Sequence, residues 1–155
     1  EIDKATLSVR FKSPEILFSE GSPKLNNKFK NILKEFFPRF IDVLNKKDYK
    51  NDIDEIRIEG HTSSRWREGT KDGIAYIKNM ELSQNRTRNV LDYVLKNETD
   101  KVLIKWIRLN VTANGLSSSK LIYNDDGIEN SDLSRRVEFR VKTNAEKRIA
   151  KILSE

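Results

Sequence analysis

The feature that most constrains the fold is a long apolar stripe in the first third of the chain. Between residues 23 and 47, large apolar side chains recur at steps of three and four: Leu25, Phe29, Ile32, Leu33, Phe36, Phe40, Ile41 and Leu44. This spacing predicts an amphipathic helix with one buried face. Ser22 is suited to cap this helix and Pro23 to occupy its first position, whereas Pro38 predicts a kink or a division into two helices. A helix with a single apolar face must pack against a second layer of structure.

Segments in which apolar and polar residues alternate predict the β-strands. They span residues 6–11, 54–59, 106–112 and 136–141. Ser13 and Pro14 end the first of these strands, and residues 16–18 are expected to form a further short extended piece. A second helix is predicted to begin at its cap Ser83, and a terminal helix is predicted over residues 145–153.

The order strand, helix, strand, helix, strand, strand sets the expected fold class. It predicts an α/β domain of the two-layer α+β sandwich type, with helices packed on one face of a mixed sheet. The 155 residues are enough for a hydrophobic core. We therefore expect a single domain over residues 1–155, with its core at about residues 6–143. Residues 62–78 and 114–134 are expected to be long irregular connections.

Charge and composition narrow the classes of function. The net charge of +6 fits a nucleic acid, an anionic membrane surface or the carboxylate-rich bacterial wall. Basic residues concentrate in residues 24–50 and 135–151, but aromatic residues do not alternate with them as they do where nucleic-acid bases stack, so no nucleic-acid partner is expected. No apolar run reaches the roughly 18–20 residues of a membrane span. The start of the chain also lacks the features of a signal peptide, so targeting and anchoring segments are expected outside it.

No set of residues predicts an enzyme, a metal site or a cofactor. The single histidine, His61, directly follows a strand and stands beside Thr62, Ser63 and Ser64. Neighbouring side chains on an extended chain point to alternate faces, which makes a catalytic triad awkward here. One histidine and no cysteine leave too few ligands for a zinc site. The simplest interpretation of His61 is a histidine that is hydrogen-bonded at the end of a strand.

One arginine lies where a helix should present apolar residues. If Ser83 caps the second helix, Arg86 is its third residue, and it continues the four-residue spacing of Val90 and Val94. It should therefore lean inward, whereas Arg88 points to solvent. The positive end of the helix dipole opposes this charge unless an anion is present. Two explanations fit: an internal salt bridge to a carboxylate, or a site that binds a ligand carboxylate through two hydrogen bonds.

Three sequence blocks together resemble the OmpA-like peptidoglycan-binding domain. They are residues 56–62 (IRIEGHT), 79–86 (NMELSQNR) and 135–139 (RRVEF), in the order that the family has them. With their flanking elements they cover about residues 6–143. The second block is most similar to MotB-type motor subunits. Residues 60–64, together with Trp66, are most similar to the stator subunits of the Zorya anti-phage system.

The resemblance implies a ligand and a place for the domain. The implied ligand is the diaminopimelate of a peptidoglycan stem peptide, with its carboxylate held by Arg86. The other residues of the implied pocket are Asn79, Ser63, Thr62, Met80, Leu82 and Arg136. The resemblance further implies a non-catalytic periplasmic domain that anchors an ion-driven motor or similar membrane complex to the wall. Membrane subunits would be reached through a segment before Glu1, and a homodimer is implied.

The chain departs from the family pattern at Ser63. Most members have an aspartate there, which faces the ammonium group of the ligand, so the change removes a charge pair worth about 1–3 kcal/mol. Hydrogen bonds to Ser63 or Ser64, or a movement of Asp72, would compensate. Ser134 in place of the family's asparagine is a milder change. The alternative function is a protein-interaction or structural domain that kept the fold and lost peptidoglycan binding.

Overall fold

Five strands form one mixed sheet in the order β1-β2-β5-β3-β4 in the computed structural model, which describes residues 1–3, 7–12 and 14–154. The strands are β1 (Ile2–Asp3), β2 (Ser8–Phe11), β3 (Ile53–His61), β4 (Val111–Gly115) and β5 (Arg136–Thr143). Neighbouring strands are antiparallel except for β3 and β4, which are parallel. A parallel pair needs a long crossover connection, and residues 62–110 supply it with two helices.

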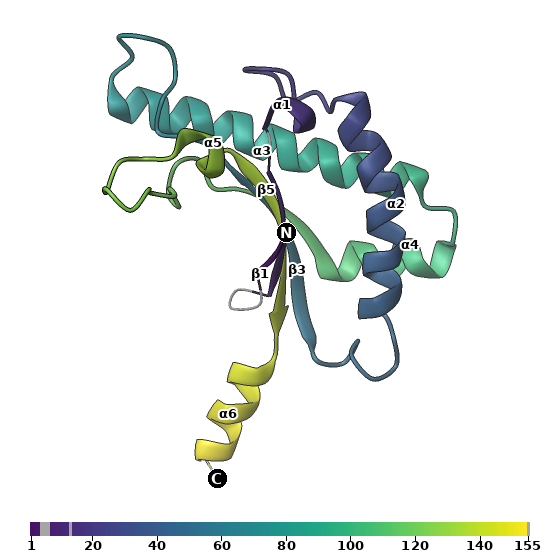
Figure 1. Ribbon diagram of the computed structural model, residues 1–155. Helices are drawn as coiled ribbons and strands as arrows, with labels where there is room; N and C mark the ends of the chain where they lie inside the picture. Colours follow the sequence, from purple (N-terminus) through teal and green to yellow (C-terminus); the bar gives the residue numbers. More distant parts are fainter. Residues whose placement is uncertain (4–6, 13, 155) are drawn as a thin grey trace.

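Helices cover one face of this sheet (Figure 1). They are α1 (Pro14–Leu17), α2 (Asn27–Leu44), α3 (Asp72–Asn97), α4 (Lys101–Asn110), α5 (Ser131–Ser134) and α6 (Ala145–Ser154). Helices α2, α3 and α4 form the layer on the sheet, whereas α6 follows β5 and projects away (Figure 1). The predicted two-layer α/β class is therefore confirmed. Within the described part of the chain, none of the helices is long and apolar enough to cross a membrane.

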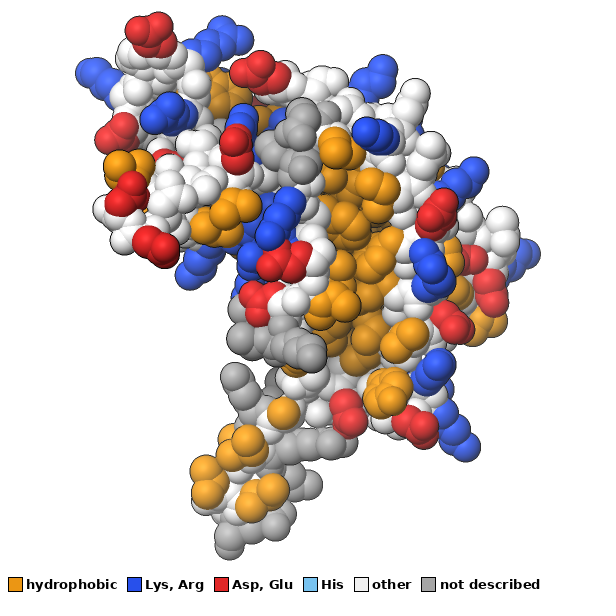
Figure 2. Space-filling model, in the orientation of Figure 1, with side chains coloured by type: hydrophobic (Ala, Val, Ile, Leu, Met, Phe, Trp, Pro, Cys, Tyr) orange, Lys and Arg blue, Asp and Glu red, His pale blue; other side chains and the backbone are white. Residues whose placement is uncertain are grey.

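The core lies between these helices and one face of the sheet. The strands contribute Ile56 and Ile58 from β3 and Val137 and Phe139 from β5. Helix α2 contributes Phe29, Leu33, Phe37 and Ile41, which recur every four residues. Phe29, Leu33 and Ile41 belong to the predicted stripe, whereas Phe37 was not predicted and the predicted Ile32 is exposed. The ring of Phe139 also lies 5.3–6.0 Å from the rings of Phe11, Phe36, Phe37 and Phe40. One side of this aromatic cluster meets solvent, where Figure 2 shows hydrophobic side chains in a strip along α2.

The boundaries of the first elements differ from those predicted. Residues 16 and 17 are helical rather than extended, because Pro14–Leu17 form α1, and only Phe18 of the predicted piece lies in a β-bridge. Helix α2 begins at Asn27 rather than Pro23, because Leu25 is held in an antiparallel bridge to Phe18. It continues as one helix through Pro38, which removes only one backbone hydrogen bond from a helix whose buried stripe extends on both sides.

The predicted start of the second long helix is wrong. Helix α3 begins at Asp72, so Ser83 is not a cap but a fully buried residue in the middle of the helix. Its hydroxyl accepts a hydrogen bond from the backbone N–H of Ser117 at 3.1 Å and donates one to the carbonyl of Met80 at 3.0 Å. Arg86 therefore lies far from the helix terminus, and the dipole argument does not apply to it.

The predicted third strand, at residues 106–112, is also wrong. Most of it belongs to α4, which is capped by the side chain of Asp100 accepting from the backbone of Val102 and Leu103. The strand β4 begins only at Val111, where the chain pairs with Ile56 of β3. The helix prevails because this cap and the buried Ile107 stabilise it.

The remaining elements agree with prediction. The strands predicted at residues 54–59 and 136–141 and the helix predicted at 145–153 match β3, β5 and α6 to within two residues at each end. The first predicted strand matches β2 from Ser8 onward, whereas Thr6 and Ser13 lie outside the described residues. The two-residue strand β1 was not predicted, since it is too short to show alternation.

Candidate functional site

A groove of about 770 Å³ opens beside α3. Its residues from α3 and from the segment after β3 are Asn79, Leu82, Arg86, Thr62, Ser63, Arg65, Trp66 and Arg67. The others are Phe18, Glu20 and Gly21, between α1 and α2, and Ser131 and Arg135. This volume suits a small ligand, because ligand pockets in proteins typically enclose about 300–1,000 Å³.

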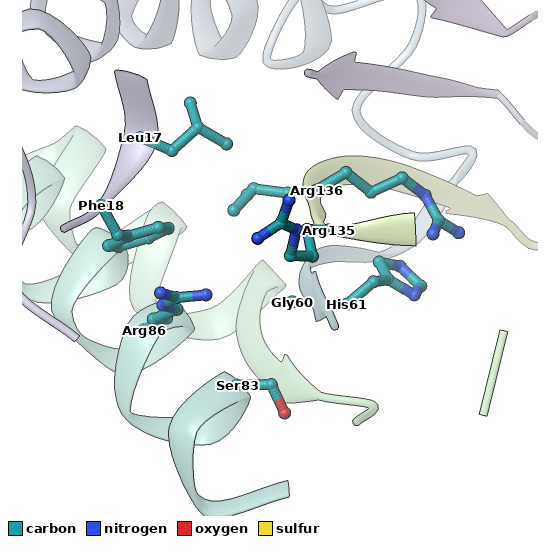
Figure 3. A pocket seen from close by; sticks show the side chains of 9 residues that line it. Leu17, Phe18, Gly60, His61, Ser83, Arg86, Arg135 and Arg136 are labelled. Carbon is teal, nitrogen blue, oxygen red and sulfur yellow. The ribbon is translucent and has the colours of Figure 1, made fainter. Parts of the chain in front are cut away.

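Arg86 reaches from the middle of α3 to the turn between α1 and α2. Its Nε donates a hydrogen bond to the carbonyl oxygen of Ser22 at 3.0 Å, and its Nη2 donates to that of Ser19 at 3.3 Å. The guanidinium carbon lies 4.7 Å from the centre of the Phe18 ring, a cation–π distance (Figure 3). These contacts hold the guanidinium at the groove. Arg88, two residues on, is exposed, so the predicted inward and outward directions of the two arginines are confirmed.

No described carboxylate neutralises Arg86. Among the side chains that the structure describes, no carboxylate oxygen lies within 4.0 Å of its guanidinium nitrogens, so no internal salt bridge is seen there. Burial, and secondly the charge of Arg135, lower the pKa of Arg86 to about 10, which leaves it a cation at neutral pH. Arginine has five N–H donors, and the hydrogen bonds to the two carbonyls leave others for a ligand. The arrangement therefore favours binding of an anion.

Asn79 holds the opposite wall of the groove in place. Its buried side-chain amide donates hydrogen bonds to the carbonyl oxygens of Ser63 at 3.2 Å and of Arg65 at 3.0 Å. The next residue, Ser64, donates its backbone N–H to Glu129 at 3.0 Å and its hydroxyl to the same carboxylate. Ser63 is thus held by Asn79 at its own carbonyl and by Glu129 through its neighbour Ser64. The amide of Asn79 shapes this wall and is already occupied by it.

The groove brings together five of the seven predicted site residues: Arg86, Asn79, Ser63, Thr62 and Leu82. Met80 does not line it. Arg136 does not line it either, and only a small crevice of about 10 Å³ lies between Arg86 and Arg136. In Figure 3 the side chain of Arg135 lies on the side of Arg86, whereas that of Arg136 extends away beside His61. Arg135, and not Arg136, therefore supplies positive charge at the groove beside Arg86.

Arg136 belongs instead to a buried ionic network on the sheet face away from the helices. Its Nε donates to Oε1 of Glu138 at 2.5 Å, and Arg10 of β2 donates to the same oxygen at 2.9 Å. Burial alone would raise the pKa of Glu138, but the hydrogen bond and charge of Arg136, together with the charge of Arg10, outweigh burial and lower it to about 2. The Nη1 of Arg136 also donates a hydrogen bond to the carbonyl oxygen of Ser134 at 3.0 Å, which joins the network to the end of α5.

His61 lies in this network as a neutral group. Burial lowers its pKa, and within the described residues neither ring nitrogen has a hydrogen-bond partner. Its Nε2 is 3.5 Å from Oε2 of Glu59, at the limit of hydrogen-bond distance. The expected hydrogen bond at the strand end is therefore not formed.

Three residues of this buried network form the strongest metal candidate within the described part of the chain. Glu59, His61 and Glu138 offer ligand atoms that lie within 4.8 Å of one another. The two carboxylates, however, are already paired with the guanidinium groups of Arg10, Arg57, Arg136 and Arg140. Four positive charges around two negative charges leave no net attraction for a cation, so these residues do not fit a metal ion.

Sequence reasoning missed eight of the residues that line the groove: Phe18, Glu20, Gly21, Arg65, Trp66, Arg67, Ser131 and Arg135. The run Arg65-Trp66-Arg67 had a usable signal, since it stands in a loop directly after a strand, where binding residues are often found. Phe18 and Glu20 had none. They lie 68 and 66 residues from Arg86 in the sequence and reach it only through the fold.

Comparisons with known proteins agree on one family. The model of the OmpA family matches residues 17–135. The Zorya protein ZorB of Escherichia coli is 50% identical over 155 residues, which are 100% of this chain and 65% of that protein. The chain thus spans about two thirds of the length of this relative.

Solved structures share the fold at low sequence identity. A crystal structure of the periplasmic domain of Helicobacter pylori MotB has a TM-score of 0.61 at 20% identity, covering 94% of this chain and 80% of that one. The cell wall anchor of the T6SS from Pseudomonas aeruginosa has a TM-score of 0.54 at 24% identity, covering 88% and 80%.

Proposed function

Because this chain belongs to the OmpA family, we propose that its groove binds a peptidoglycan stem peptide and so anchors a membrane complex to the cell wall. The family is non-catalytic, and the chain is not an enzyme. The proposed ligand is of the diaminopimelate type, with one carboxylate on Arg86. Thr62, Ser63, Asn79 and Leu82 would form the rest of the pocket.

The observation that carries this proposal is the uncompensated charge of Arg86. Its guanidinium is half-buried, held by two carbonyls and the Phe18 ring, and has no described carboxylate within 4.0 Å. A buried cation is costly unless an opposite charge reaches it. Arg135 increases the positive potential at the same place. A ligand carboxylate would supply the missing charge and accept the free N–H donors.

The wider role is proposed from the relatives. ZorB is a Zorya protein, and the neighbouring structures include periplasmic MotB domains and a cell wall anchor. We propose that residues 1–155 act as a single periplasmic domain of a motor-like Zorya complex. Membrane subunits would connect through a segment before Glu1, and two copies would form a homodimer. Nucleic acid has no part in this proposal.

Replacing Arg86 by alanine tests the proposal. We expect Arg86→Ala to weaken binding to purified diaminopimelate-type sacculi by about 10- to 100-fold, the range for a lost charge-assisted hydrogen bond. The melting temperature should change little, because the variant loses two hydrogen bonds but also a buried, uncompensated charge. Arg88→Ala is the matched control, since it removes the same charge from an exposed position of the same helix. Equal binding by both variants would reject Arg86 as the ligand contact.

Salt separates specific binding from general attraction. Exposed charges are screened beyond about 8 Å at physiological salt, so the attraction due to the net charge of +6 should disappear as salt rises. A salt-resistant fraction of sacculus binding should remain in the wild type and be lost in Arg86→Ala. A nucleic-acid binder would instead bind DNA tightly with a steep logarithmic salt dependence, and a domain that lost its ligand would retain no sacculi at high salt.

Replacing Ser63 by aspartate should strengthen binding to a soluble stem peptide. Ser63 lines the groove and is 8% exposed, so a carboxylate there would face an ammonium group of the ligand in a partly dry site. We expect a gain of about 3- to 10-fold by calorimetry, as for a modest new ion pair. In the Ser63→Asn variant the new side chain has the size and shape of aspartate but no charge, so this variant should show no such gain. Weaker binding by the aspartate variant would mean that the pocket requires the serine.

A further inference from the structure

The charges that line the groove are strongly unequal. Four arginines face it: Arg65, Arg67, Arg86 and Arg135. Among the described residues that line it, Glu20 is the only carboxylate. A groove with this balance attracts carboxylates but repels ammonium groups, unless the single negative charge is placed where the ammonium arrives.

Glu20 is placed beside the anion site by the contacts of Arg86 itself. The backbone N–H of Ser22 donates to the carbonyl of Ser19 at 3.0 Å, which closes a turn with Glu20 and Gly21 at its centre. Gly21 has a φ of +61°, a left-handed conformation that suits glycine. Arg86 donates to the carbonyls at both ends of this turn, at 3.0 and 3.3 Å. Glu20 therefore projects from a turn that is fixed directly to the guanidinium.

The carboxylate of Glu20 is available for a ligand. The residue is exposed at the rim of the groove, and no described cation lies within 4.0 Å of its carboxylate oxygens. By contrast, Arg135 at the same groove is already paired with Asp132. Glu129, which approaches the opposite wall, is occupied by Ser64.

An α-amino acid centre fits these two charges together. Its ammonium nitrogen and its carboxylate carbon are bonded to the same carbon and lie only about 2.5 Å apart. When Arg86 holds the carboxylate, the ammonium must therefore stay within a few ångströms of the guanidinium. Ser63 offers oxygen atoms there but no charge.

We propose that Glu20 binds this ammonium group and makes the groove selective for a zwitterionic α-amino acid centre over a simple carboxylate. This inference rests on the proposed function, since it names what the Arg86 site recognises in its peptide ligand. Among the residues that line the groove, Glu20 supplies the negative charge at the position of the ligand amine. It determines specificity, whereas Arg86 supplies the primary anchor.

Two soluble ligands test whether Glu20 binds the ammonium group of the ligand or affects ligand binding in general. The first is a stem tripeptide that ends in diaminopimelate with a free zwitterionic centre, and the second is the same peptide with that amine acetylated. Calorimetry on Glu20→Gln should show about 10-fold weaker binding of the free-amine peptide and unchanged binding of the acetylated one. Glu81→Gln, an equal charge change at an exposed position of α3 that does not line the groove, should change neither. In the Glu20→Gln background, Ser63→Asp should restore the lost affinity.

The outcomes separate the two proposals. If Glu20→Gln binds both peptides like the wild type, or weakens both equally, the role of Glu20 is rejected. If Arg86→Ala then binds neither peptide, the proposed function would still be supported. If the wild type binds neither peptide, both proposals are rejected. An unchanged melting temperature of Glu20→Gln, expected for an exposed residue, shows that the variant is folded.

Discussion

Replacing Gly115 by alanine should lower the free energy of unfolding by about 3 kcal/mol or prevent folding, at the upper end of the range for an overpacked interior. A Cβ atom at this position would lie 2.3 Å from the backbone nitrogen of Gln84 and 2.7 Å from its Cα. Those atoms belong to the middle of α3, a helix of 26 residues, so they cannot move aside as a flexible side chain would. The expected loss therefore reports how closely α3 lies on β4.

Gly73 provides the matched control. It also belongs to α3, but a Cβ atom there would have nothing within 4 Å. Gly73→Ala should therefore raise the stability by up to about 1 kcal/mol, because alanine favours a helix more than glycine does. Urea unfolding measures both variants. An unfolding midpoint of Gly115→Ala equal to that of the wild type would contradict the close contact, which also sets the position of Asn79 and Arg86 at the groove.

Periodicity predicted the parts of the fold in which burial decides the structure. The stripe that includes Phe29, Leu33 and Ile41 predicted α2, and all three side chains are buried. The same reasoning placed Arg86 on the inner side of its helix from its spacing to Val90, without knowledge of what surrounds it. These predictions succeed because a side chain every four residues lies on one face of any α-helix.

The prediction of where α3 begins failed because some of its apolar residues are exposed and one of its buried residues is polar. The first turns of α3 expose Ile74 and Ile77, at 55% and 63%, and bury only Ala75, so this part of the sequence shows no apolar stripe. Ser83 looked like a cap because serine is common at helix starts. It is instead fully buried in the helix, where its hydroxyl bonds the segment after β4. A polar residue that is satisfied by a distant backbone atom cannot be recognised from its neighbours.

The candidate site was predictable only for residues within the sequence blocks. Asn79, Leu82 and Arg86 come from one helix and were found together. Glu20 and Phe18 join them through a turn that Arg86 itself holds, and this contact depends on the three-dimensional path of the chain. Arg135 and Arg136 are neighbours on one segment, and alternation places one at the groove and the other in the buried network.

The buried network should be the second large determinant of stability. Glu138 is fully buried and neutralises Arg10 and Arg136, with Arg140 at 3.5 Å. Removing one partner of a buried ion pair leaves the other charge uncompensated and typically costs about 3–5 kcal/mol. Glu138→Ala should therefore lower the unfolding free energy by about that amount at pH 7. Asp92→Ala is the control, since its pair with Lys96 is exposed and should contribute less than about 1 kcal/mol.

The same carboxylate should make the wild type sensitive to acid. The pKa of Glu138 falls from 4.5 to about 2 on folding, so its ionised form favours the native state. This contribution, about 3 kcal/mol for such a shift, is fully present above pH 4.5 and is lost as the pH falls through about 2. His61, whose pKa burial lowers from 6.5, acts in the same direction, because below that pH the unfolded chain takes up a proton that the folded chain does not.

Urea unfolding at pH 7, 5, 4 and 3 would measure this dependence. The wild type should lose stability over the whole series, first through His61 and then through Glu138. Glu138→Gln keeps the size of the side chain but cannot ionise, so it should be less stable at pH 7 and should show a shallower loss below pH 4.5. Parallel curves for the two proteins below that pH would mean that Arg10 and Arg136 do not stabilise the Glu138 carboxylate. In that case the ion pairs on this face of the sheet that contribute to stability would be those of Glu59 with Arg57 and Arg140.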